Sequence, residues 1–224
     1  MQLSFAFVKK YYPIFLEGLG FTIKLSLIVI AIASLIGIIV YFMKASKLSV
    51  FGIRPISIVA RFYIEVMRGT PVLLMLLMAY SGIKMLLGVD VTVGFAAVAA
   101  MSLNSGAYVA EIIRAGVEAV DKGQVEAARS LGMNGLQCAR LVVAPQAVKN
   151  ILPAIANEFV GVIKGSSMAS VLGVSELTFS AKIVQGATYL ALEPLIVVGA
   201  LYLVLTYSLG RAINMLERRL KNSD

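Results

Sequence analysis

Long apolar stretches dominate the chain and predict helices that cross a membrane. A span needs about 20 mostly apolar residues, and the cleanest candidate is 25–43, with no charged residue between Lys24 and Lys44. Four more candidates cover residues 56–87, 91–113, 152–172 and 194–216. The pattern predicts an all-α membrane protein with five transmembrane helices, preceded by a short amphipathic helix along the membrane interface over residues 5–16.

The placement of basic residues predicts the orientation of the chain. Five spans put the two termini on opposite sides of the membrane. One side would then hold the loop with Lys44, Lys47 and Arg54, the basic segment 114–149 and the C-terminal tail. Because basic loops concentrate on the cytoplasmic side, we expect the N-terminus outside and the C-terminus inside a bacterial cell (inner) membrane.

Composition excludes several classes of enzyme. The chain is 59% hydrophobic and 14% charged, against about a quarter charged in an ordinary soluble domain. It has no histidine and one cysteine, Cys138, which excludes a histidine-based catalytic site, an intrachain disulfide and a cysteine-cluster metal site. It has no Gly-Lys dipeptide and so no Walker A loop for ATP. We expect a single non-enzymatic domain over residues 1–224, without metal or cofactor, and with residues 20–216 as its membrane core.

The polar segment 121–153 predicts a short helix that needs a partner. Asp121 is a good N-cap, Gln124 stands where a capping box would place it, and Gly132 is suited to end the helix. A helix over 122–131 is too short to be stable alone in water. It either docks on another protein or is a solvated connector in this cytoplasmic loop.

The same segment carries a recognisable motif. Glu126-Ala127-Ala128, followed by Gly132 and then by 142–145 (VVAP), resembles the EAA motif of ABC importer permeases, although Ile-x-Leu-Pro is the usual ending. Three further stretches resemble the polar amino-acid branch of that family, which includes the histidine, glutamine and arginine permeases: 68–71 (RGTP), 103–111 (LNSGAYVAE) and 124–133 (QVEAARSLGM). The resemblance covers about residues 15–220.

This resemblance implies the fold of the type I importer transmembrane domain and a transport function. The helix over 122–131 would be the coupling helix, seated on a dimer of separate ATPase subunits that bind ATP and magnesium. The residues that would couple to the ATPase are Glu126, Ala127, Ala128, Arg129 and Gly132. A second permease subunit, of the same or a different chain, and an extracytoplasmic solute-binding protein that delivers the amino acid would complete the importer.

Polar residues at membrane depth are costly and are candidates for a substrate pathway. Gly69 separates two half-helices, and Thr70 as N-cap with Pro71 behind it would expose a helix N-terminus that attracts a carboxylate. Asn104, Tyr108 and Glu111 recur at helical spacing on one face. The candidate pathway residues are Arg68, Thr70, Asn104, Ser105, Tyr108, Glu158 and Ser166.

The charged residues at membrane depth also have a purely structural interpretation. Arg68 could pair with Glu65, Glu158 with Lys164 or Arg68, and Glu111 with Arg114 or Arg61, in each case only to stabilise the bundle. If Glu158 instead faces the pathway, it favours a substrate with a cationic side chain. Relatives usually carry Asp or Glu after the lysine at 164, whereas this chain has Gly165.

Small residues recur every four positions at Gly161, Gly165, Ala169 and Gly173. This stripe predicts a tight helix contact, within the chain or between subunits. Cys138 is expected to be a small buried residue.

Two other functions are compatible with an apolar five-span chain. An ion-driven secondary transporter could use Glu111 and Glu158 to carry protons, and a membrane assembly protein would have no pathway of its own. The first predicts uptake without an ATPase. The second predicts that substitutions at Asn104 or Glu158 harm assembly and leave substrate preference unchanged.

Overall fold

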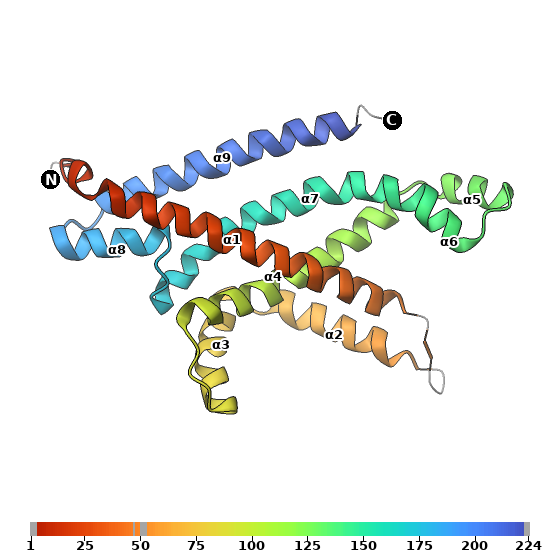
Figure 1. Cartoon of the computed structure of the whole chain (residues 1–224), viewed down its shortest axis with the longest axis horizontal. Coiled ribbons are helices and arrows are strands. Elements are labelled where there is room, and N and C mark those ends of the chain that lie inside the picture. Colours follow the sequence, from red (N-terminus) through yellow and green to blue (C-terminus); the bar gives the residue numbers. More distant parts are fainter. Residues whose placement is uncertain (1–3, 47, 50–52, 222–224) are drawn as a thin grey trace.

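The computed structural model describes residues 4–46, 48–49 and 53–221; Lys47, used in the orientation argument, lies outside them. The described chain is built of helices (Figure 1). In order they are α1 (Val8–Ala45), α2 (Pro55–Gly69), α3 (Val72–Leu87), α4 (Val93–Glu118), α5 (Lys122–Ser130), α6 (Gly135–Cys138), the π-helical turn η1 (Ala139–Val143), α7 (Ala144–Gly165), the 3₁₀ helix η2 (Ser166–Leu172), α8 (Leu177–Thr188) and α9 (Glu193–Lys221).

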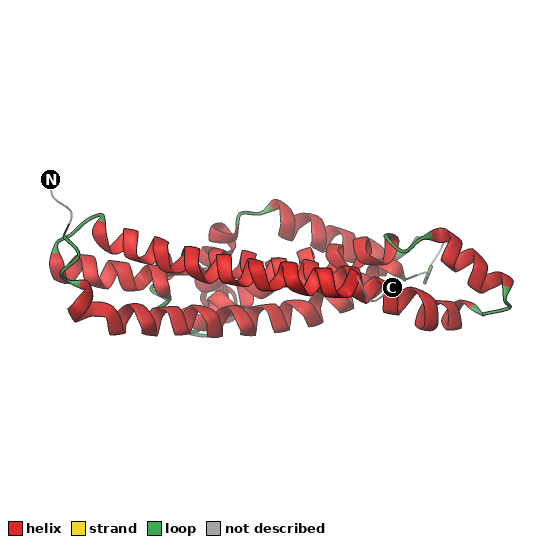
Figure 2. Cartoon of the chain, turned by 90° about the horizontal axis from the view of Figure 1, so that it is seen from above, coloured by secondary structure: helices red, strands yellow, loops and turns green. Residues whose placement is uncertain are grey.

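The long helices form an elongated bundle with α5 and α6 at one end and the N-terminus at the other (Figures 1 and 2). The helices α1 and α4 form its most extensive pair, because glycines let their backbones approach. A Cβ atom on Gly37 would lie 2.5 Å from Val109 Cγ1, and one on Gly106 would lie 2.6 Å from Ile36 Cγ2. Any larger side chain at these two positions would push the helices apart.

The predicted separate interfacial helix over 5–16 is wrong, because α1 is continuous from Val8. Its first turns pack against α8: Phe15 is 2% exposed and lies in an apolar cluster with Leu177 and Val184. Thr22 Oγ1 also accepts a hydrogen bond of 3.0 Å from the Leu177 N–H. A helix of 38 residues is about 57 Å long, well beyond the roughly 30 Å hydrocarbon core.

The predicted break at Gly69 is confirmed. The helices α2 and α3 meet there at a bend of 108°. The predicted capping is wrong by one residue: Thr70 ends α2 in an extended conformation, and Pro71 takes the N-cap position of α3. The ring of Pro71 disfavours a helical conformation for the residue before it, and the Thr70 hydroxyl instead donates 2.7 Å back to the Val66 carbonyl.

The predicted count of five spans is not confirmed. Among the described residues, α1, α4 and α9 are long and apolar enough to cross a membrane, and the bent pair α2–α3 can count as a fourth span. The predicted fourth helix over 152–172 is different in the structure: α7 begins earlier, at Ala144, and η2 replaces α-helix after Gly165. Pro145 lies in the first turn of α7, where a missing N–H costs nothing. Polar residues such as Lys149, Asn150 and Glu158 lower the hydropathy of α7.

The small-residue stripe makes no tight contact within the described chain at its glycines. A Cβ atom would meet nothing within 4 Å at Gly165 or Gly173, and only Glu158 Oε2, at 3.9 Å, at Gly161. Ala169 is buried, but the change to 3₁₀ geometry at Ser166 moves it off the face that a continuous α-helix would give. The intrachain contact is therefore not found, and a contact between subunits stays a prediction.

Candidate functional site

A cavity of about 180 Å³ lies between α4 and α7 beside the first residue of α3. It is smaller than the usual pocket for a drug-sized molecule. Its lining residues are Val72, Met101, Asn104, Ser105, Tyr108, Glu158, Gly161, Val162 and Gly165. The structure thus brings four of the seven predicted pathway residues to one place: Asn104, Ser105, Tyr108 and Glu158.

Asn104 fixes the break between α2 and α3. It is 6% exposed, and its Nδ2 donates a 2.7 Å hydrogen bond to the Met67 carbonyl in the last turn of α2. The same amide lies 3.5 Å from Met75 Sδ in α3. A carbonyl near a helix end has no partner within its own helix, so Asn104 satisfies it and holds the start of α3 against the cavity.

Among the described residues that line this cavity, Glu158 and the Tyr108 phenol are the ionisable groups. The Ser105 hydroxyl lies close to the Glu158 carboxylate in the same cavity wall. No ion pair of Glu158 with Lys164 or Arg68 is found in the described part of the chain. A partly buried carboxylate that faces a cavity without a cationic partner can accept hydrogen bonds from a cationic ligand.

Arg68 lies next to Tyr108, one of the residues that line the cavity. Its guanidinium carbon lies 5.2 Å from the centre of the Tyr108 ring, a cation–π contact. The alternative considered for Arg68, an ion pair with Glu65, is not found among the residues that the structure describes. Thr70 does not line the cavity and is occupied by its bond to α2.

Ser166 is separate from the cavity. It is fully buried, and its hydroxyl donates 2.7 Å to the Ile163 carbonyl. It lies near a buried cluster in which Tyr202 donates 2.7 Å to Glu176. The Glu176 carboxylate is also the N-cap of α8, where it accepts hydrogen bonds from Thr178 and Phe179. Sequence reasoning missed this cluster because its members are far apart in the chain and α8 is too short to be recognised as a span.

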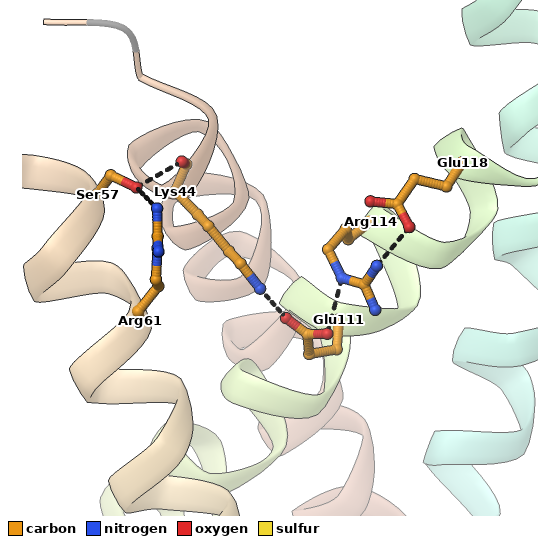
Figure 3. Close-up of polar contacts among 6 residues, drawn as sticks. All are labelled: Lys44, Ser57, Arg61, Glu111, Arg114 and Glu118. Carbon is orange, nitrogen blue, oxygen red and sulfur yellow. Dashed lines mark hydrogen bonds and ion pairs between the residues drawn. The ribbon is translucent and has the colours of Figure 1, made fainter. Parts of the chain in front are cut away.

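Glu111 belongs to an ion-pair network, at the end of α4 that leads to α5 (Figure 3). Its carboxylate binds Lys44 of α1 and lies 2.8 Å from Arg114 Nε, while Arg114 also pairs with Glu118. The predicted pairing with Arg114 is therefore confirmed. Arg61 instead donates to Ser57 Oγ at 3.3 Å.

The short helix predicted over 122–131 is present as α5, and its coupling role stays a prediction. The Asp121 carboxylate caps it by accepting from the Gly123 N–H at 2.7 Å, without the expected capping box at Gln124. Gly132 has φ +85°, and the Gly132 and Met133 N–H groups bond to the carbonyls of Arg129 and Ala128. This is a Schellman ending, as the position of Gly132 predicted.

One face of α5 packs against α6 and η1, while most of its surface is exposed in the described chain. Glu126, Ala127 and Arg129 are exposed, whereas Ala128 is buried. Leu131 and Leu136, which flank the turn after the helix, are 82% and 78% exposed. Such large apolar side chains at a helix tip are typical of a docking surface. Cys138 behind them is buried, as predicted.

Comparison with known proteins defines the class of this chain. Residues 50–222 match the family described as binding-protein-dependent transport system inner membrane component, and the chain belongs to this family. It is 42% identical, over the full length of both chains, to the arginine transport system permease protein ArtQ of Bacillus subtilis (strain 168). It is 36% identical to the putative glutamine transport system permease protein GlnP of Rickettsia conorii, over 96% of this chain and 98% of that protein.

Solved structures agree with the family. A crystal structure of an amino acid ABC transporter with histidines has 46% sequence identity and a TM-score of 0.92, covering 98% of this chain and 100% of the other. An inward-facing structure of the MetNI methionine ABC transporter has 17% identity and a TM-score of 0.77, which shows a shared fold. The chain is a permease subunit of an amino-acid ABC importer, as its motifs predicted.

Proposed function

We propose that this permease subunit passes amino acids with a cationic side chain across the bacterial cell membrane. The observation that carries the proposal is the position of Glu158, a carboxylate that faces the cavity and has no cation bound to it in the described chain. The names of the relatives, arginine and glutamine permeases, agree with a polar amino acid and do not choose between a charged and a neutral side chain.

The α-carboxylate and the cationic side chain of such a substrate would bind to different parts of the cavity. Val72, the first residue of α3, lines the cavity, so the N-terminal N–H groups of that helix lie beside it. These groups attract an α-carboxylate, and the guanidinium of Arg68 at the edge adds a second positive charge. The cationic side chain would then lie against Glu158. Gly165 contributes no charge and leaves open space beside the cavity, so Glu158 would supply the negative charge alone.

Transport would be driven from α5. We infer that its exposed face and the apolar tip with Leu131 and Leu136 dock on an ATPase subunit, which holds the ATP and magnesium. Two permease subunits would enclose the pathway, and a binding protein would deliver the amino acid from outside. The end of the bundle with α5, the C-terminus and the Glu111 network would face the cytoplasm (Figure 1). Nothing in the comparisons favours an ion-driven transporter.

Binding to the purified importer tests the substrate class. The permease and its ATPase are purified together, and binding of radiolabelled arginine is compared with that of citrulline, its neutral isostere. We expect a preference for arginine that Glu158→Gln lowers about tenfold or more, because a hydrogen bond to a charged group contributes about 1.5–3 kcal/mol. The control is Glu65→Gln, which removes an exposed carboxylate from α2 outside the cavity. An unchanged preference in Glu158→Gln would exclude this role.

A separate experiment tests the docking of α5. Glu126→Lys reverses a charge on the exposed face, and Gln124→Lys adds a positive charge elsewhere on the same helix as a control. We expect Glu126→Lys to lose ATP hydrolysis stimulated by the loaded binding protein, or to lose the ATPase on purification, while Gln124→Lys keeps both. Normal coupled transport by Glu126→Lys would contradict the docking role.

A further inference from the structure

A basic cavity of about 400 Å³ lies where α1, α2 and α4 meet, outside the candidate substrate site. Three cationic side chains line it, those of Lys44, Arg61 and Arg114, together with a single carboxylate, Glu118. Figure 3 shows these side chains arriving from three different helices. The Ser57 hydroxyl links the Arg61 side chain to the backbone of α1, since it accepts from Arg61 and donates 2.9 Å to the Lys44 carbonyl.

Counted over the described residues, the cavity has unused hydrogen-bond donors and one uncompensated positive charge. Lys44 and Arg114 share Glu111 and Glu118 between them, so these four groups are neutral together. Arg61 is exposed, binds only a hydroxyl and forms no ion pair with any described residue. A guanidinium has five N–H donors, which leaves most of those of Arg61 available to an anion in the cavity.

An apolar groove of about 480 Å³ continues directly from the basic cavity. Tyr41 and Val117 line both spaces. The groove runs between α1, α4 and α7, and apart from Ser34 and the Tyr41 hydroxyl its lining is hydrocarbon or aromatic, including Ile38, Phe42, Val148 and Ile151. A ligand that fills both spaces must be an amphiphile, with an anionic end and an apolar chain.

The position along α1 places this pair of cavities at the membrane boundary. Lys44 is the first charged residue after the apolar stretch that begins beyond Lys24. The rings of Tyr41 and Phe42, whose centres are 5.4 Å apart, lie one turn before it, and Phe42 is 66% exposed. Aromatic and basic side chains gather in this way at the level of lipid headgroups, and basic pockets between helices on the cytoplasmic side suit anionic headgroups.

We propose that the two cavities form one binding site for an anionic phospholipid of the cytoplasmic leaflet. The phosphate lies against Arg61, with Lys44 and Arg114 beside it, and an acyl chain lies in the groove along Ile38 and Val148. A single phosphodiester charge matches the one uncompensated cation. The bound lipid joins α1, α2 and α4 at the end of the bundle that leads into α5.

Native mass spectrometry of the intact importer in mild detergent tests this site. The probes are phosphatidylglycerol, phosphatidylcholine with the same acyl chains, and glycerol 3-phosphate, which has the anionic group without the chains. We expect phosphatidylglycerol to be retained at least tenfold better than phosphatidylcholine, and an excess of glycerol 3-phosphate not to displace it. Equal retention of the two lipids, or displacement by glycerol 3-phosphate, would overturn the proposal.

Substitutions locate the lipid. Arg61→Gln removes the free cation, and Val148→Trp fills the groove from an exposed position on α7, so each is expected to lower retention about tenfold. Arg54→Gln, a nearby exposed arginine that does not line the cavity, is the control for general surface charge. Arg61→Lys keeps the charge and should retain more lipid than Arg61→Gln. An equal loss with Arg54→Gln, or no loss with both Arg61→Gln and Val148→Trp, would refute the site.

Discussion

Replacing Asn104 by alanine should loosen the break between α2 and α3. The change removes the Nδ2 donor that lies 2.7 Å from the Met67 carbonyl and leaves that carbonyl unpaired in a region where Asn104 itself is 6% exposed. A buried polar group left without a partner costs about 1–3 kcal/mol. For a chain of this size, each kcal/mol lowers the melting temperature by about 2–4 °C, so we expect a fall of about 2–12 °C.

The control for Asn104→Ala lies on the same helix. Ser102 is 2% exposed, and its hydroxyl has no hydrogen-bond partner among the described residues. Ser102→Ala therefore loses no hydrogen bond and should leave the melting temperature of the complex unchanged or slightly higher. Asn104→Asp keeps the shape of the side chain but loses the donor. It should lower the melting temperature at least as much as Asn104→Ala does.

Thermal unfolding of the purified importer, followed by the loss of soluble complex after heating, measures these differences. Uptake should fall together with stability, because the start of α3 borders the substrate cavity. If Asn104→Ala and Asn104→Asp both have the melting temperature of the unchanged protein, the Met67 carbonyl does not need the hydrogen bond from Asn104. That result would refute the account of the break.

Three further predictions follow from the packing and the charges. Gly18→Val places side-chain atoms within 3.1 Å of the α8 backbone and should destabilise the complex, whereas Gly20→Val, with nothing within 4 Å, should not; thermal unfolding compares the two. Glu111→Gln weakens a network whose carboxylate is 16% exposed and should cost about 1–3 kcal/mol, while Asp90→Asn breaks an exposed pair and should cost less than about 1 kcal/mol. Gly132→Ala forces alanine to φ +85° at about 1–2 kcal/mol, and should lower stimulated ATP hydrolysis more than it lowers binding of the amino acid.

Local signals in the sequence were sufficient to predict the short helix α5 and the break between α2 and α3. The N-cap Asp121 and the terminating Gly132 each act on the helical turn next to them, so their pattern predicts both ends of the helix. The break at Gly69 was predicted, but the exact cap was not, because the effect of Pro71 on the residue before it outweighed the capping preference of Thr70.

The assembled site depended on contacts between distant segments. Helical spacing placed Asn104 and Tyr108 on one face, and the structure adds Glu158 from α7 opposite them. Ser166 was predicted from its polarity alone. Its hydroxyl bonds to the Ile163 carbonyl, and the residue does not line the cavity. The pairing of Lys44 with Glu111 joins residues 67 positions apart, and no local pattern indicates it.

The most direct test of the account asks whether the cavity at Glu158 lies on the route of the amino acid. Gly161 lines that cavity and has room for a side chain, and Cys138 is the only native cysteine. In a Cys138→Ser background, Gly161→Cys is exposed to a small charged thiol reagent in the reconstituted importer, with Gly210→Cys on α9 as the control. We predict that arginine, with the binding protein and ATP, slows modification at 161 and leaves 210 unaffected. Modification at 161 that is the same with and without substrate would contradict the account.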